Sequence, residues 1–196
     1  MRIIAGQAGG RRLAAPPAGT RPTTDRVREA LFSSLDSHVR EESGGWGEIE
    51  FLDLFAGSGA IGLEAMSRGA RGATLVERDR HCLEVLRRNV AEVDPRARVV
   101  PADATTWRPD GGPFDIVYVD PPYALSDDDV RGVLGLLARH GALDEGALVV
   151  VERSSRSEAP WPSEGWQHLR KRDYGDTALW YGRASPTVNP TVDEEA

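Results

Sequence analysis

Residues 51–62 are FLDLFAGSGAIG, a short apolar run that passes directly into a glycine-rich turn. The last six residues, from Gly57 through Gly59 to Gly62, match the Gly-x-Gly-x-x-Gly pattern of dinucleotide-binding domains. Glu77 stands twenty residues after Gly57, where those domains carry an acid that binds ribose hydroxyls. The pattern therefore predicts a strand, a tight turn and a helix, with a nucleotide-like cofactor held at the turn.

Apolar runs alternate with helix-like stretches from this turn onward. The runs at 51–55, 73–77, 98–101, 115–119 and 147–152 are typical of strands. The stretches 61–68, 80–93 and 127–139 carry apolar residues at three- and four-residue spacing, which is typical of helices with one buried face. Strands this continuously apolar are usually covered on both sides, as in a parallel sheet. The sequence thus predicts a doubly wound, Rossmann-like α/β sheet.

The two ends of the chain depart from this alternation. Residues 2–5 and 11–15 flank a glycine-containing stretch and predict a small N-terminal β-hairpin extension. A proline-rich link leads to a helix that begins at Thr24 or Asp25. Residues 166–174 and 177–182 predict a second, antiparallel hairpin. We expect an N-terminal region of residues 1–22, a main domain of residues 23–183 and a disordered acidic tail of residues 184–196.

The composition excludes several classes of protein. The chain has 196 residues and no apolar run of 18, so it is long enough for one domain and lacks a membrane-spanning segment. The single cysteine, Cys82, cannot form an internal disulfide, which suits the reducing cytoplasm. The four histidines lack the spacing of metal ligands. We expect a cytoplasmic monomer that needs no metal and contacts no membrane.

Charge is unevenly distributed along the chain. The net charge is −7, but residues 1–30 hold six arginines and two acids, which is +4, so the other residues sum to −11. The six are Arg2, Arg11, Arg12, Arg21, Arg26 and Arg28. A basic arm ahead of an acidic body indicates a contact with nucleic-acid phosphates. The commoner role of any single arginine is a solvated surface, so the prediction rests on the cluster.

Asp53 separates the cofactors that the glycine turn could hold. It lies four residues before Gly57, near the end of the first strand, where ligands bind in this fold. A carboxylate there would repel the pyrophosphate of NAD and attract the ammonium of a methionine moiety, which favours S-adenosylmethionine. Glu77 can bind ribose hydroxyls in either case. Asp103, after the third strand, is placed either to accept a hydrogen bond from an adenine amino group or to cap a helix at 105–107.

Asp120-Pro121-Pro122-Tyr123 directly follows the fourth strand and indicates the reaction. The exocyclic amine of a base is a poor nucleophile until its hydrogens are held. Asp120 and the Pro121 carbonyl would accept those hydrogens, while Tyr123 stacks on a flipped-out base. In isolation the four residues could be a structural turn. Together with the glycine turn and Glu77 they predict methyl transfer from S-adenosylmethionine to an amine by direct in-line displacement.

Five stretches occur in the order found in RsmD-type methyltransferases, and the chain resembles that family over residues 2–183. They are RIIAGQAGGRRL, RPTTDRVREALF, FLDLFAGSGAIGLEAMSRGA, IVYVDPPY and YGDTALWYG. The resemblance implies a class I S-adenosylmethionine-dependent methyltransferase fold. It also implies methylation of the N2 amine of one guanine in bacterial 16S ribosomal RNA, within an assembled or partly assembled small subunit.

The same resemblance implies a role for each candidate residue. It implies RNA contacts from the N-terminal segment, catalysis by residues 120–123, and cofactor contacts from Asp53, Gly57, Gly59, Glu77 and Asp103. One physical point agrees with guanine as the target. A carboxylate suits the adjacent N1–H and N2–H donors of guanine, whereas adenine pairs its amino donor with an acceptor at N1. Aspartate also occurs at this position in adenine enzymes, so the chemistry leaves both bases open.

Two alternative functions remain at this point. One is an adenine-N6 methyltransferase acting on DNA or RNA, although the length leaves no room for a large DNA-recognition domain. The other is a non-catalytic RNA-binding factor of ribosome assembly, against which the intact turn at Asp120 and Glu77 argue. If the N-terminal arm serves only RNA, deleting residues 1–20 should spare cofactor binding and raise the apparent KM for RNA.

Overall fold

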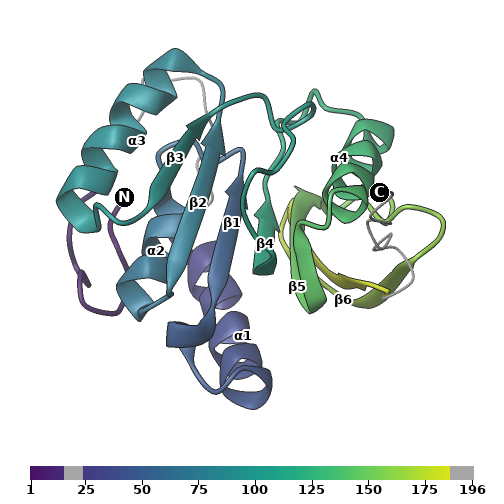
Figure 1. Cartoon of the computed structure of the whole chain (residues 1–196), viewed down its shortest axis with the longest axis horizontal. Helices are drawn as coiled ribbons and strands as arrows, with labels where there is room; N and C mark the ends of the chain where they lie inside the picture. Colours follow the sequence, from purple (N-terminus) through teal and green to yellow (C-terminus); the bar gives the residue numbers. More distant parts are fainter. Residues whose placement is uncertain (16–23, 186–196) are drawn as a thin grey trace, which may run out of the picture.

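The computed structural model describes residues 1–15 and 24–185, which form one α/β domain around a single sheet (Figure 1). The sheet has seven strands within these ranges, in the order β3-β2-β1-β4-β5-β7-β6. They are β1 (Glu50–Leu54), β2 (Gly72–Glu77), β3 (Arg98–Pro101), β4 (Phe114–Val119), β5 (Leu143–Ser154), β6 (Trp166–Tyr174) and β7 (Thr177–Ala184).

The order of the strands confirms the doubly wound topology. Strands β1 to β5 pair in parallel, whereas β7 pairs antiparallel with both β5 and β6. In chain order, β1 is the first strand of the sheet, and β2 and β3 are added in turn on one side of it. The next strand, β4, is added on the other side of β1. The strand order therefore reverses between β1 and β4, and in open α/β sheets ligands bind at such a switch point.

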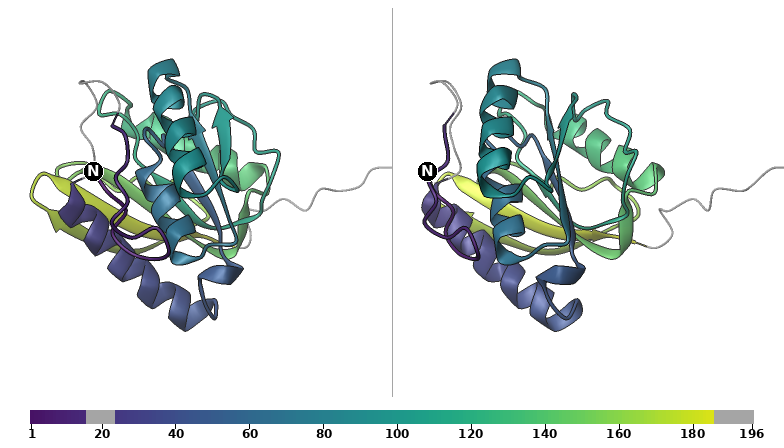
Figure 2. Two further views of the ribbon diagram at one scale, coloured as in Figure 1. Left: turned by 90° about the vertical axis from the view of Figure 1, so that its left-hand side faces the viewer. Right: turned by 60° about the vertical axis from the view of Figure 1, so that its left-hand side comes forward.

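Helices cover both faces of the sheet. They are α1 (Asp25–Glu42), α2 (Ala60–Arg68), α3 (Arg80–Val93) and α4 (Asp127–Arg139), with a short 3-10 helix at Trp46–Glu48. The buried sides of α1, α2 and α3 pack in one hydrophobic cluster and that of α4 packs in another, so three helices lie on one face and one on the other (Figure 2). This three-layer arrangement explains why strands with apolar residues at nearly every position are stable.

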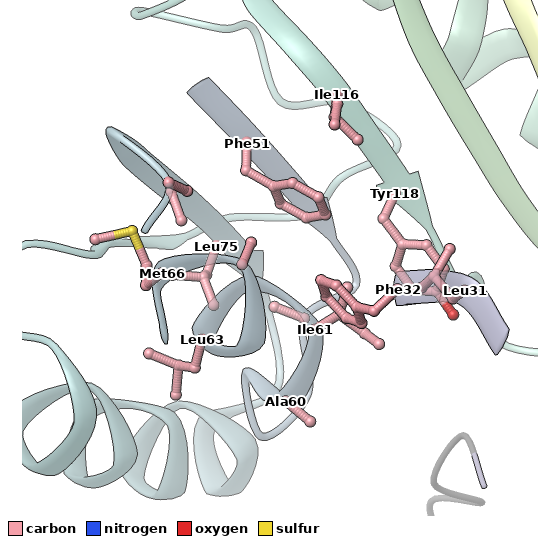
Figure 3. Packing of buried hydrophobic residues seen from close by; sticks show 14 of the residues in the cluster. Leu31, Phe32, Phe51, Ala60, Ile61, Leu63, Met66, Leu75, Ile116 and Tyr118 are labelled. Carbon is pink, nitrogen blue, oxygen red and sulfur yellow. The ribbon is translucent and has the colours of Figure 1, made fainter. Parts of the chain in front are cut away.

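The larger cluster lies beneath the three helices (Figure 3). Phe51 of β1 and Tyr118 of β4 face this side and contact the layer that carries Phe32 of α1, all three almost fully buried. The next residue of β1, Leu52, belongs to the opposite cluster. Because successive strand residues point to opposite faces, Asp53 shares the face of Phe51 and points towards α2.

The N-terminal segment, residues 1–15, folds back on itself as predicted, although its arms are too short to count as two full strands. Its two arms pair antiparallel through one bridge between Arg2 and Arg12, and the Ile3 N–H donates to the Arg11 carbonyl at 2.9 Å. The segment lies along the helical layer, beside α2 and α3 (Figure 2). Ile3 and Leu13 are buried against that layer, so the segment belongs to the folded domain.

Some predictions fall outside the described residues. The proline-rich link at 16–22, with Arg21 in it, and the predicted tail from residue 186 onward lie there. Strand β7 extends to Ala184, two residues beyond the predicted hairpin. No described helix is both long and apolar enough to cross a membrane.

Candidate active site

The candidate site lies where β1, β2 and β4 end side by side. Leu54 of β1 is level with Val76 of β2 and Val119 of β4, and all three strands run in the same direction. The segments that follow them are therefore brought to one edge of the sheet. Those segments are the glycine turn, the end of β2 at Glu77 and the turn that starts at Asp120.

The glycine turn adopts a backbone that glycine favours. Gly57 and Gly59 have φ values of 55° and 80°, and Phe55, which is not glycine, has φ 62°. Such a conformation costs a non-glycine residue roughly 1–3 kcal/mol and is found most often at functional sites. A Cβ on Gly59 would lie 2.4 Å from a methyl carbon of Leu86, so this glycine is required for packing. A Cβ on Gly57 would meet no atom of the described chain within 4 Å, which leaves open space for a ligand to approach its backbone.

Glu77 ties the end of β2 to the glycine turn. One carboxylate oxygen accepts the Gly57 N–H at 2.8 Å, and the other accepts the N–H groups of Arg78 and Asp79 at 2.8 and 2.7 Å. Each oxygen of an ionised carboxylate can accept about two hydrogen bonds, so the oxygen at Gly57 can take a further donor. The carboxylate is half-buried and borders the open side of Gly57.

Asp53 is buried beneath the same turn. Its side chain is 2 % exposed and accepts the N–H of Gly62, in the first turn of α2, at 2.9 Å. Burial raises the pKa of Asp53 to about 7, the Gly62 N–H opposes that rise, and the nearby charge of Glu77 adds to it. Because the pKa of this carboxyl group is close to neutral pH, a cation that binds nearby can shift the group to its ionised form.

Asp103 lies in a turn after β3, and the helix at 105–107 that was the alternative prediction does not form. One carboxylate oxygen accepts both the N–H and the hydroxyl of Thr105, at 3.0 and 2.7 Å. The other pairs with Arg78 at 2.8 Å. Hydrogen bonds from Thr105, followed by the Arg78 charge, hold the pKa of Asp103 below its usual value, so the group is ionised at neutral pH. Arg78 was not predicted as a site residue, and its ion pair with Asp103 joins the ends of β2 and β3.

The turn after β4 presents one buried and two exposed residues. Pro121 is buried, Pro122 is exposed, and the Tyr123 ring is 62 % exposed, which is unusual for a large aromatic residue. The Pro122 carbonyl accepts the Leu125 N–H at 2.9 Å, whereas no backbone N–H of the described residues donates to the Pro121 carbonyl. The Pro121 carbonyl is the one predicted from the sequence to accept a hydrogen bond from the amine that is methylated.

Two residues of β5 that the sequence analysis did not single out lie near this turn. The guanidinium of Arg153 donates to the Leu125 carbonyl at 3.0 Å and to Asp127 at 2.7 Å, which fixes the exit of the turn into α4. Glu152 accepts a hydrogen bond from the buried Tyr118 hydroxyl. Because Val119 is level with Val151, Glu152 lies beside Asp120 on the adjacent strand.

The predicted RNA-binding arginines divide into exposed and buried groups. Arg2, Arg11, Arg12 and Arg26 are exposed, and Arg21 lies outside the described residues. Arg28 is fully buried, and its guanidinium donates to the Arg2 carbonyl at 2.8 Å and to Asp25 at 2.7 Å. The inclusion of Arg28 was therefore wrong: it joins α1 to the N-terminal segment and is not presented to a phosphate. A run of arginines does not reveal which member faces inward.

Comparison with known proteins places these features in a family. The family model described as "Conserved hypothetical protein 95" matches residues 1–183. The chain is 41 % identical over 185 residues to ribosomal RNA small subunit methyltransferase D of Escherichia coli, which covers 91 % of this chain and 87 % of that protein. It is 34 % identical over 188 residues to the putative rRNA methyltransferase YlbH of Bacillus subtilis, which covers 91 % and 96 % of the two chains.

A solved structure agrees with both relatives. The structure of the putative methyltransferase yhhF from Escherichia coli is 37 % identical, with a TM-score of 0.80, and the match covers 94 % of this chain and 98 % of that one. The range matched by the family model, residues 1–183, includes the N-terminal segment, the sheet up to Arg183 and both turns at the site.

Proposed function

The chain belongs to the RsmD-type methyltransferase family, and we propose on this basis that it transfers a methyl group from S-adenosylmethionine to the N2 amine of a guanine in 16S ribosomal RNA. One observation carries the proposal. The glycine turn held by Glu77 and the turn Asp120–Tyr123 follow neighbouring parallel strands, so a cofactor and an acceptor base would meet at one edge of the sheet.

The residues at the glycine turn fit S-adenosylmethionine. Gly57 offers an open backbone, Glu77 has acceptor capacity for ribose hydroxyls, and Asp53 can balance the ammonium of the methionine part. Asp103 would accept a hydrogen bond from the adenine amino group. When bound, the cofactor supplies an electrophilic methyl group on a sulfonium.

The turn after β4 would prepare the acceptor. Asp120 and the Pro121 carbonyl would accept the two hydrogens of the exocyclic amine, which aims the nitrogen lone pair. The exposed Tyr123 ring would stack on the base once it has left the RNA helix. Arg153 holds the far end of this turn, so its geometry is set before the base arrives.

We include guanine as the base and the small subunit as the substrate in this proposal. A carboxylate matches the adjacent N1–H and N2–H donors of guanine. Arg2, Arg11 and Arg12 lie exposed on the N-terminal segment and would contact phosphates of the RNA. We also propose that the protein acts as a monomer in the cytoplasm. An adenine-N6 methyltransferase is the second candidate, because the same turn could hold an adenine amine.

The experiment is methyl transfer from tritium-labelled S-adenosylmethionine to four acceptors in parallel. The acceptors are small ribosomal subunits from cells that lack this activity, the same RNA after deproteinisation, unmethylated duplex DNA, and buffer alone. We expect label in the subunits, recovered as N2-methylguanosine. Label recovered as N6-methyladenine would overturn the choice of base, and absence of label from every acceptor would contradict the proposal of a methyltransferase.

A further inference from the structure

Asn89 of α3 is a buried amide that the proposed chemistry does not use. It lies in the polar-looking stretch between Leu86 and Val90, yet its side chain is fully buried. A buried primary amide must satisfy two donor hydrogens and an acceptor oxygen, and leaving them unpaired is costly. The partners that Asn89 chooses therefore show what it holds in place.

The first partner is the N-terminal segment. The Asn89 Oδ1 accepts the Ala14 N–H at 2.9 Å, and the Asn89 Nδ2 donates to the Ala14 carbonyl at 3.0 Å. This is a two-point clasp on one backbone residue, of the kind that two adjacent strands use. It fixes Ala14 in both position and orientation relative to α3.

The second partner is the glycine turn. The same Nδ2 group donates to the carbonyl of Ser58, between Gly57 and Gly59, at 2.9 Å. The turn is thus held on two sides, because Glu77 accepts the Gly57 N–H at 2.8 Å. One NH2 group therefore bonds a residue of the N-terminal segment and a residue of the candidate cofactor turn at the same time.

The rest of the N-terminal segment is docked on α2 by contacts of its own. The Ile4 and Ala5 N–H groups donate to the buried carboxylate of Glu64 at 2.6 and 3.0 Å. The Ala8 N–H donates to the Ser67 hydroxyl at 3.0 Å. A Cβ on Gly6 would lie 1.9 Å from the Ser67 carbonyl oxygen, so the backbone is pressed directly onto α2.

We propose that Asn89 is a positioning residue that couples cofactor binding at the glycine turn to the order of the N-terminal segment. A cofactor that fixes the turn fixes the Ser58 carbonyl, and through the shared NH2 group it tightens the clasp on Ala14. The coupling is reciprocal: the factor by which the cofactor raises the affinity for RNA bound to the arginines of the segment equals the factor by which that RNA raises the affinity for the cofactor. The inference rests on the proposed function, since it takes S-adenosylmethionine as the cofactor and RNA as the acceptor.

The test is backbone hydrogen exchange with and without S-adenosylhomocysteine on the full chain. In the wild type we expect the cofactor product to slow exchange at residues 13–15 by about 5-fold or more, within the usual range of coupling between sites. Asn89→Asp keeps the oxygen that accepts the Ala14 N–H and loses both donated bonds. In that variant S-adenosylhomocysteine should still slow exchange at the glycine turn but leave residues 13–15 unchanged.

Glu64→Gln is the matched control, because it weakens docking of the segment on α2 and leaves the Asn89 contacts intact. Its exchange at residues 13–15 should be faster without ligand and should still respond to S-adenosylhomocysteine. A wild type that binds the ligand with no change at residues 13–15 would overturn the coupling, and this result needs no variant to fold. Full protection retained in Asn89→Asp would also overturn it. Failure of S-adenosylhomocysteine to bind at all would instead contradict the proposed function.

Discussion

The raised pKa of Asp53 should make the stability of the protein depend on pH. An exposed aspartate has a pKa near 3.9, and burial raises that of Asp53 to about 7. Between these values the folded protein binds one more proton than the unfolded chain, so stability falls as pH rises from about 4 to about 7. Asp53→Asn should remove this loss, of the order of a few kcal/mol, and flatten the pH profile. Urea unfolding from pH 5 to pH 8 measures it, and parallel profiles for the two proteins would contradict the assignment.

The same carboxyl group should make cofactor affinity depend on pH. An ammonium is attracted only by the ionised form of Asp53, so affinity for S-adenosylhomocysteine should rise as pH increases through about 7 and then level off. Calorimetric titrations between pH 5.5 and pH 8.5 test this, with Asp53→Asn as the comparison. The variant should bind more weakly at pH 8 and show little change with pH. An affinity that falls over this range would show that the ionised carboxylate is not needed.

Asp120 is expected to act on the acceptor alone. Asp120→Ala should reduce the methyl-transfer rate at least about 100-fold, a typical loss when a group that positions a reactant is removed. Affinity for S-adenosylhomocysteine should stay within a few-fold, because the proposed cofactor residues lie on or directly after β1, β2 and β3. Single-turnover rates and equilibrium binding separate the two effects. Equal losses in both would place Asp120 in the cofactor site.

At the scale of elements, the N-terminal segment behaves as part of the domain. Glu64→Ala would leave the Ile4 and Ala5 N–H groups and the Arg68 guanidinium without a carboxylate that is fully buried. We expect a loss of roughly 3 kcal/mol in the free energy of unfolding, together with faster proteolysis of residues 1–15. Glu84→Ala, at an exposed position on α3, should change stability by no more than about 0.5 kcal/mol. Equal stability of the two variants would refute this docking.

The same docking corrects the expectation that residues 1–20 could be deleted without effect on the cofactor site. Deletion would expose the apolar surface that Ile3 and Leu13 cover, and it would remove the backbone partners that the segment supplies to Asn89 and Glu64. A loss of RNA binding in such a truncated protein would therefore not identify the RNA contact. Single surface substitutions are the cleaner probe.

Arg12 offers such a probe because it is exposed on the docked segment. Arg12→Ala should weaken binding of deproteinised 16S ribosomal RNA. The negative slope of log affinity against log salt should become shallower by about 0.7–0.9, as for one lost phosphate contact. Arg139→Ala, an exposed change at the end of α4, serves as the control and should leave the slope unchanged. Fluorescence titrations at several salt concentrations measure both. Matching slopes for Arg12→Ala and the wild type would remove Arg12 from the interface.

Across the whole molecule, the sequence predicts the sheet far better than it predicts the contacts of the N-terminal segment. The bounds of α3 and α4 agree with apolar periodicity, because each helix buries one face and the pattern is local. The bounds of β3 and β6 also agree with the prediction, and β6 was predicted from the turn at Gly175 and Asp176 that joins it to the next strand. The meeting of the glycine turn, Glu77 and Asp120 also followed from the sequence, since parallel strands end at one edge. Strand β5 is longer than predicted, because Asp144, Glu145 and Gly146 near its start are exposed and interrupt the apolar run.

The roles of Glu64, Arg28 and Asn89 could not be predicted from the sequence. Their partners in the N-terminal segment are backbone groups 26 to 75 residues away, and backbone groups leave no trace in residue type or spacing. One sequence feature could have indicated the role of Asn89. It is a polar residue on the buried face of a helix, next to the apolar Leu86 and Val90. The three residues together explain why a segment that looks like a mobile basic arm is docked.

The direction of β7 determines at which edge of the sheet a tag or linker can be attached without covering the candidate site. Thr177 pairs with Ser154 at the carboxyl end of β5, and Arg183 pairs with Leu148 further back, so β7 leaves the sheet at the edge opposite the glycine turn. Met1 belongs to the docked segment, and its carbonyl accepts the Leu13 N–H at 3.1 Å. An affinity tag, sensor-chip linker or fluorescent protein is therefore best placed on the chain beyond β7 and not before Met1. A protein immobilised from that edge of the sheet would keep its candidate site facing the solution, where the proposed RNA substrate has access to it.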